Sequence, residues 1–287
     1  MLTLSRRSAR LLVLALAFAA GGCASSGTTL PPGTLDPDKL LFERGTEALN
    51  NKKWFTAREY FRQIVEGYPQ SQYRADAKLG LGDTYLGEGT TQGQVLAVNE
   101  FREFLTFFPT HPRADYAQFK LAMAYYYQMA KAERDQTNTK EALKEFDAFF
   151  ERFSSSPLAD EARQRQREAR DRLSESDYRV GLFYYRTRWY PGAIDRLQGL
   201  LKADPGYTNR DAVYYYLAES LAAVKREAEA LPYLDKLVQE FQSSQYLERA
   251  QKRIPELKAA MATAPPPPPA PVPPSAPSTT TTGMSNR

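Results

Sequence analysis

Apolar residues recur at intervals of three and four along most of the chain, from Asp38 to Ala262. This spacing places them on one face of a helix, and no strand-like alternation persists. Glycine and proline stand mostly where one apolar segment ends and the next begins. The pattern therefore predicts an all-α body over residues 38–262.

The helical pattern repeats itself along the chain. Two full copies, more than a hundred residues apart, share identical intervals: Gly45, Ala48, Trp54, Ala57, Phe61, Ile64 and Pro69 match Gly181, Tyr184, Tyr190, Ala193, Leu197, Leu200 and Pro205. Partial copies occupy residues 82–109, 122–149 and 218–237. Such self-similarity is typical of a stack of equivalent supersecondary units.

These residues resemble the tetratricopeptide repeat, a pair of antiparallel helices about 34 residues long. Small side chains such as Gly45 and Ala57 allow two helices to approach closely, and large ones such as Phe61 fill the space around them. One pair cannot bury its own apolar face, so pairs must stack. We expect a right-handed superhelix of about five such pairs.

Three segments fall outside the clean repeat. Residues 157–172 are rich in charge and are interpreted as an extra helix between the third and fourth pairs. Residues 131–139 are polar and predict an exposed loop, and residues 243–262 predict a capping helix. Pro232 lies deeper in its helix than Pro191 and predicts a kink or a shifted helix boundary there.

The first 22 residues predict a signal peptide. Three arginines precede the apolar run at residues 11–20, and Gly21, Gly22 and Cys23 follow it. The run is half of the roughly 20 residues that a spanning helix requires. The small residues before Cys23 resemble the bacterial lipobox, which implies cleavage before Cys23 and acylation of its thiol. A transmembrane anchor and an ordinary signal peptide with an incidental cysteine are the alternatives.

Both flanks of the body differ from it in composition. Residues 23–37 predict a polar tether, and residues 263–287 predict a disordered, proline-rich tail that is extended like polyproline II. The tail is either a simple spacer or a ligand for a proline-binding groove. By resemblance to sorted lipoproteins, Ala24 after the cysteine favours the periplasmic face of the outer membrane over the inner one.

Composition argues against most enzyme chemistry. The chain has one Cys and one His, so a zinc cluster or an internal disulfide cannot be assembled. His111 stands between Thr110 and Pro112 and is interpreted as a turn residue. Without the three arginines of the signal segment, 35 basic residues face 34 acidic ones, which offers no dense basic face for nucleic acid. We expect no enzymatic activity, no cofactor and no metal.

The joints between repeats carry a family resemblance. Residues 68–73 (YPQSQY), 108–112 (FPTHP) and 241–246 (FQSSQY) share one style, and residues 194–201 (IDRLQGLL) add to it. Behind a lipobox, these segments resemble the BamD family of outer-membrane assembly lipoproteins, over roughly residues 37–258. The resemblance implies a scaffold of the β-barrel assembly machine. It also implies binding of the barrel protein BamA through C-terminal repeats, contact with other lipoproteins of the complex, and capture of unfolded outer-membrane proteins by N-terminal repeats.

Three residues are candidates for partner contacts. Tyr126 and Tyr185 follow the repeat positions of Tyr125 and Tyr184 and are expected to reach a concave groove. Arg196 adjoins the packing residue Leu197 and should project outward, towards a folded partner. An alternative function is that of another cell-envelope tetratricopeptide lipoprotein, which serves peptidoglycan or polysaccharide machinery.

Overall fold

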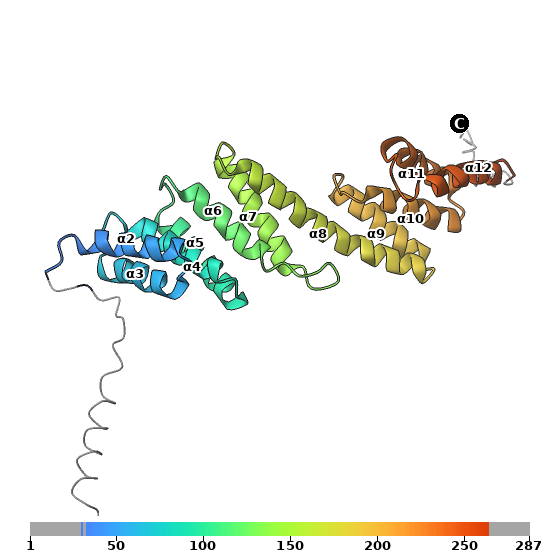
Figure 1. Ribbon diagram of the computed structural model, residues 1–287. Helices are drawn as coiled ribbons and strands as arrows, with labels where there is room; N and C mark the ends of the chain where they lie inside the picture. The colour runs from blue at the N-terminus through green and yellow to red at the C-terminus, as the bar shows by residue number, and fades with distance from the viewer. Residues whose placement is uncertain (1–29, 31–32, 264–287) are drawn as a thin grey trace, which may run out of the picture. The chain divides into compact units, whose positions relative to one another are not determined.

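The computed structural model describes Leu30 and residues 33–263 of the chain. Cys23, the tether up to residue 29 and the proline-rich tail from residue 264 lie outside these residues. In the described part the helices are α2 (Pro37–Asn50), α3 (Trp54–Gly67), α4 (Arg74–Glu88), α5 (Thr91–Phe107), α6 (Ala114–Tyr126), α7 (Thr137–Phe153), α8 (Ala159–Arg186), α9 (Tyr190–Ala203), α10 (Arg210–Ala223), α11 (Glu227–Glu240) and α12 (Leu247–Thr263) (Figure 1).

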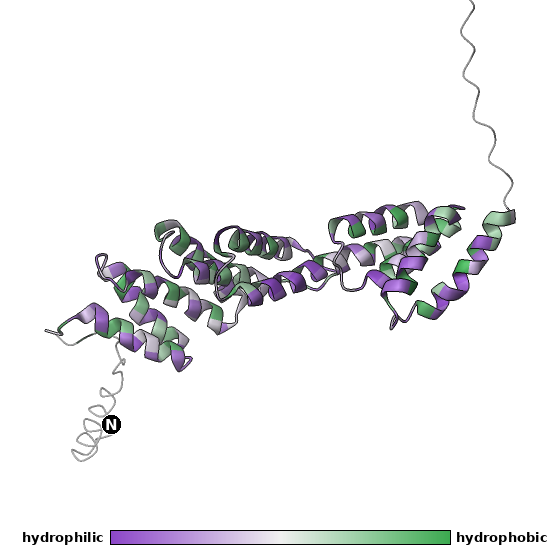
Figure 2. Cartoon of the chain, turned by 90° about the horizontal axis from the view of Figure 1, so that it is seen from above, coloured by the Kyte–Doolittle hydropathy of each residue, from purple (hydrophilic) through white to green (hydrophobic). Residues whose placement is uncertain are grey.

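Consecutive helices form five pairs, α2–α3 to α10–α11, and α12 follows the last pair (Figure 1). The described residues contain no strand. The predicted all-α architecture of paired helices is therefore confirmed, and α12 occupies the place of the predicted capping helix. Hydrophilic and hydrophobic residues alternate around the helices (Figure 2), as expected where one side of each helix is covered.

The second helix of every pair carries a fully buried alanine at the same repeat position. Each of these residues has 0% of its surface exposed: Ala57, Ala97, Ala142, Ala193 and Ala230. Four residues later stands a large buried side chain: Phe61, Phe101, Phe146, Leu197 or Leu234. Because both positions are buried in all five pairs, the repeat register predicted from the spacing is correct.

In the first and fourth pairs, close approach depends on a glycine in the first helix. A Cβ atom on Gly45 would lie 2.7 Å from the ring of Phe61, and one on Gly181 would lie 2.6 Å from Leu197 Cδ2. Both distances are shorter than real carbon contacts, so no larger side chain fits without displacement. These two glycines set the spacing of α2–α3 and α8–α9.

In the loops that follow the first and fifth helix pairs, a serine hydroxyl forms a hydrogen bond to the first helix of the same pair. Ser71 donates to Asp38 Oδ2 at 2.6 Å, and Ser244 donates to Asp211 Oδ2 at 2.6 Å. Each serine oxygen also accepts a hydrogen bond from the amide two residues later. This double use explains why serine occupies the middle of the joint.

The chain divides into two compact units. Of the described residues, the first contains those up to Arg179 together with Asp204–Thr208, and the second contains Val180–Ala203 and those from Asn209 to residue 263. Asp204, which lies in the first unit, accepts hydrogen bonds from Arg167 (2.5 Å) and Ser174 (2.6 Å) of α8.

Two sequence predictions need correction. The segment 157–172 is not a separate extra helix, because α8 runs unbroken from Ala159 to Arg186 and no proline or glycine interrupts it before Gly181. The loop at 131–139 is exposed only in part. Gln136 is buried and donates to the carbonyl oxygens of Lys131 (2.8 Å) and Arg134 (2.9 Å), which folds the loop back on itself.

Pro232 lies inside α11, as the sequence indicated. The helix begins at Glu227, so the proline stands in its second turn, where its missing N–H removes one backbone hydrogen bond. The buried side chains of Ala230, Leu234 and Leu237 keep their repeat positions on either side of it. The proline therefore leaves the packing face of α11 in register.

Candidate binding surfaces

The described residues hold no group of three or more His, Cys, Asp or Glu side chains that could ligate a metal ion. None of their helices is long and apolar enough to cross a bilayer. The three candidate residues lie on helix pairs of different units. Tyr126 belongs to the first unit, and Tyr185 and Arg196 belong to the second, so each is described within its own unit.

Tyr126 is the last residue of α6 and is half-buried in the first unit. Its hydroxyl donates a hydrogen bond to Glu168 on α8, and the guanidinium of Arg165 lies 5.7 Å from the centre of its ring. Burial and this hydrogen bond raise the pKa of Tyr126 above its ordinary value. The same bond lowers the pKa of Glu168. Tyr126 therefore joins two helices and is not a free ring in a groove.

Tyr185 lies near the C-terminal end of α8, in an aromatic cluster of the second unit. Its ring packs edge-on against Tyr216 at 4.9 Å and against Tyr190 at 6.0 Å. Tyr216 and Tyr215 both continue the cluster to Tyr246, whose ring stacks on Tyr215 at 5.0 Å. Burial, followed by the charge of Glu219, raises the pKa of Tyr185 to about 12. Such half-buried tyrosines offer an apolar surface with polar edges.

Arg196 is exposed on α9, as the sequence predicted. Its Cβ lies 3.6 Å from the point where a Cβ on Gly181 would stand, so its stem begins at the seam between α8 and α9. No ion pair holds its guanidinium within the described part of the second unit. An exposed arginine with a covered stem can reach a carboxylate on another protein at low conformational cost.

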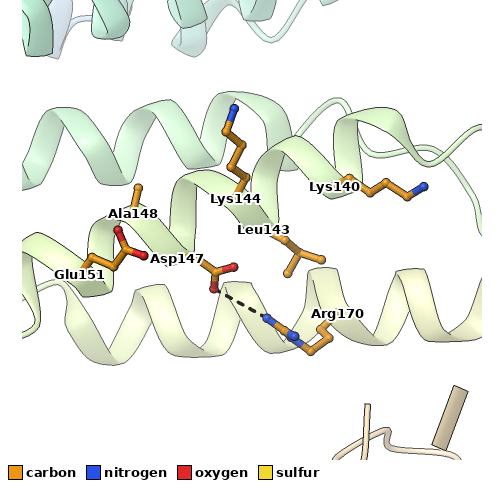
Figure 3. A pocket seen from close by; sticks show the side chains of 7 residues that line it. All are labelled: Lys140, Leu143, Lys144, Asp147, Ala148, Glu151 and Arg170. Atoms are coloured by element: carbon orange, nitrogen blue, oxygen red, sulfur yellow. Dashed lines mark ion pairs between the residues drawn. The ribbon is translucent and has the colours of Figure 1, made fainter. Parts of the chain in front are cut away.

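An open hollow of about 480 Å³ lies along α7 in the first unit (Figure 3). Its lining combines both signs of charge with two apolar side chains: Lys140, Leu143, Lys144, Asp147, Ala148, Glu151 and Arg170. Asp147 and Arg170 face each other across it at 3.7 Å. Because the lining carries charges of both signs, the hollow favours no single class of small ligand.

His111 has the structural role predicted for it. Its Nδ1 accepts a hydrogen bond at 3.2 Å from the backbone amide of Arg113, two residues later. The hydroxyl oxygens of Ser71 and Ser244 accept equivalent hydrogen bonds from the amides two residues after them. Its ring packs edge-on against Phe104 at 5.4 Å. The single histidine is thus a turn residue between the second and third pairs.

The sequence reasoning did not consider Trp189, and it took Phe183 only as one member of an aromatic run on a helix. Phe183 and Trp189 flank the turn between α8 and α9 in the second unit, and both are largely exposed. Arg186 and Arg188 stand between them and are exposed as well. The signal available in the sequence was the presence of aromatic residues on both sides of Arg186 and Arg188.

The family described as "YfiO: Outer membrane lipoprotein" matches residues 35–226, which spans the first four helix pairs and reaches into the fifth. The chain belongs to this family. Its description agrees with the localisation predicted from the sequence, at the outer membrane.

Relatives named "Outer membrane protein assembly factor BamD" match over much of the chain. The protein of Caulobacter vibrioides is 24% identical over 195 residues, which cover 68% of this chain and 63% of that protein. The protein of Vibrio cholerae is 28% identical over 205 residues, which cover 68% of this chain and 81% of that one. The chain thus spans just under two thirds of the Caulobacter relative.

Among solved structures, the TPR2AB domain of yeast Sti1 matches with a TM-score of 0.42 and 13% identity. That match covers 78% of this chain and 84% of the Sti1 chain. At this score the family assignment rests on the sequence matches.

Proposed function

We propose that the chain is a lipid-anchored, non-enzymatic scaffold for the assembly of outer-membrane β-barrel proteins. The observation that carries the proposal is the family match over residues 35–226. The named relatives are assembly factors of outer membrane proteins, and two of them match over 68% of this chain. This favours barrel assembly over the alternative role in peptidoglycan or polysaccharide machinery.

The anchor in this proposal is Cys23, acylated after cleavage of residues 1–22. A lipoprotein anchor carries several acyl chains, and each buried CH₂ contributes about 0.8 kcal/mol, which makes attachment stable. Residues 23–37 would then connect the membrane to α2. At about 3.5 Å per residue, a tether of this length reaches on the order of 50 Å when extended.

The partners in this proposal are a BamA-like barrel protein, other lipoproteins of the complex and unfolded outer-membrane proteins. Arg196 is the candidate contact for the folded partner, since it is exposed, forms no ion pair within the described part of its unit and has its Cβ at the seam between α8 and α9. Tyr185 is the candidate for extended peptide, because its cluster presents half-buried rings. Tyr126 serves the same purpose only if a ligand displaces it from Glu168.

Co-purification is the test of this function. The chain, carrying an affinity tag at its C-terminus, is recovered from detergent-solubilised membranes of its host, and the proteins that accompany it are identified. Recovery of a barrel protein with BamA-like periplasmic domains in stoichiometric amounts supports the proposal. Recovery of cell-wall or polysaccharide enzymes in its place contradicts it.

A further inference from the structure

The turn between α8 and α9 is fixed by its backbone. The amide of Trp189 bonds to the carbonyl oxygen of Tyr184 at 2.9 Å, and that of Arg188 bonds to Tyr185 at 3.0 Å. This pair of bonds is a Schellman motif, in which the residue after the helix is left-handed and is usually glycine. Here that residue is Arg188, with φ 62°. A long basic side chain therefore occupies a position that glycine or asparagine would fill with less strain.

The same turn holds an indole rigidly at the surface. Trp189 packs edge-on against Tyr184, with 4.6 Å between ring centroids, and its ring lies over Gly192, where a Cβ would meet it at 2.3 Å. Even so, Trp189 remains 54% exposed, and Phe183, whose ring lies 5.8 Å from that of Tyr184, remains 60% exposed. Because its ring is already fixed, Trp189 would lose little conformational freedom on binding.

The stretch of sequence that contains these rings carries charge of one sign. From Val180 to Ile194 the chain contains two arginines, Arg186 and Arg188, and no acidic residue. Both are exposed, and neither forms an ion pair within the described part of the chain. Two other intra-pair turns place a lysine at the same left-handed position, Lys52 (φ 55°) and Lys225 (φ 62°), so the α8–α9 turn is set apart by the exposed indole of Trp189 beside its arginines. The α8–α9 turn thus keeps its positive charge available for an outside partner.

We propose that the α8–α9 tip, defined as Phe183, Arg186, Arg188 and Trp189, contacts the surface of an anionic phospholipid bilayer as a second attachment beside the acyl anchor. Tryptophan prefers the headgroup level of a bilayer, and arginines beside it are attracted to anionic headgroups. A protein surface with an acidic groove is the rival partner. The bilayer is favoured because the family to which the chain belongs is one of outer membrane lipoproteins.

The chain contains only two tryptophans, which gives the experiment a matched pair of reporters. Trp54 starts α3, is half-buried and lies against Gly87, where a Cβ would approach its ring to 2.7 Å. In the full acylated chain, Trp54→Phe leaves Trp189 as the only indole, and Trp189→Phe leaves Trp54. Each variant is bound to phosphatidylcholine–phosphatidylglycerol vesicles, recovered by flotation and measured by tryptophan fluorescence with and without brominated lipid.

We expect the Trp189 emission to shift to shorter wavelength on these vesicles and to be quenched severalfold more than that of Trp54. The double variant Arg186→Gln with Arg188→Gly, made on the Trp54→Phe background, should lose most of this quenching. Its thermal melt should not fall, since glycine suits the left-handed position. The shift of the Trp189 emission to shorter wavelength should also be smaller on vesicles of pure phosphatidylcholine.

Two results would overturn the proposal. In the first, the emission of Trp189 neither shifts on the vesicles nor is quenched by brominated lipid, which means that the tip does not reach the bilayer. In the second, Trp189→Ala leaves membrane behaviour unchanged but abolishes recovery of a protein partner, which assigns the tip to a protein interface. Neither result bears on the assembly function, which co-purification tests separately.

Discussion

The hydroxyl of Tyr126 at the end of α6 donates a hydrogen bond to Glu168 on α8, 42 residues later in the chain. This bond ties together two helices that are not neighbours in sequence. Arg165 adds to it, because its guanidinium donates to Glu168 at 3.1 Å and lies over the ring of Tyr126. A residue predicted as a groove contact therefore also stabilises the first unit.

Tyr126→Phe should lower the free energy of unfolding by about 1 kcal/mol, the usual net value of one intramolecular hydrogen bond. It should also raise the pKa of Glu168, because the lost bond is the main cause of its lowered value. A carboxyl with a lowered folded-state pKa stabilises the fold above its ordinary pKa and loses this effect as the pH falls. The stability difference between wild type and variant should thus shrink in acid.

Urea denaturation at neutral and acidic pH measures the first effect, and NMR titration of the glutamate side chains measures the second. Tyr127→Phe is the control, because Tyr127 is exposed and its hydroxyl forms no hydrogen bond within the described part of the chain. If both variants unfolded alike at every pH, the Tyr126–Glu168 bond would contribute nothing to stability.

Ala193→Trp should destabilise the second unit by about 1–3 kcal/mol or more, the usual effect of overpacking. The side chain of Ala193 is completely buried where α9 meets its neighbours. Gly199→Ala on the same helix is the matched control, because nothing lies within 4 Å of a Cβ there. It should stabilise the helix by up to about 1 kcal/mol through helix propensity. Thermal melts that ranked these variants in the opposite order would show that the repeat register is wrong.

Arg196→Glu should reduce co-purification of the folded partner severalfold while leaving the thermal melt unchanged. Reversal of an exposed charge disturbs encounter and pairing with a partner more than it disturbs folding. Lys202→Glu is the comparison, since Lys202 is also exposed on α9 and changes the net charge equally. An equal loss of partner with both variants would indicate a general charge effect and remove Arg196 from the proposed interface.

Cys23→Ser should release the chain from the membrane fraction, because acylation needs the thiol. Cell fractionation and immunoblotting of the processed protein measure the release. A fully processed Cys23→Ser chain that stayed in the membrane through washes with salt and carbonate would contradict the lipid anchor.

The repeat register was predictable because it depends on local sequence alone. Gly45, Ala57 and Phe61 stand at intervals that any pair of packed helices must satisfy, and the structure buries all three. The role of His111 followed in the same way from the two prolines near it. Arg196 was found exposed because it adjoins the buried Leu197 on a helix of known phase.

The rest depended on contacts between segments far apart in sequence. The spacing of apolar residues around Tyr126 predicts which side of α6 it occupies. It does not predict that Glu168 of α8 lies within hydrogen-bond distance of its hydroxyl. The continuity of α8 was hidden because its charged first half lacks the repeat pattern, although no helix breaker separates it from the second half. The exposed Trp189 was assigned to no surface because its exposure follows from how it packs on Tyr184 and Gly192.

The folding state of barrel proteins in cells depleted of this chain tests the central proposal most directly. Folded outer-membrane barrels resist unheated detergent and migrate faster in electrophoresis than their heated, unfolded forms. We predict that depletion lowers the folded fraction of the major barrel proteins and that wild-type chain, but not Cys23→Ser, restores it. An unchanged folded fraction together with defective peptidoglycan or surface polysaccharide would contradict a role in barrel assembly.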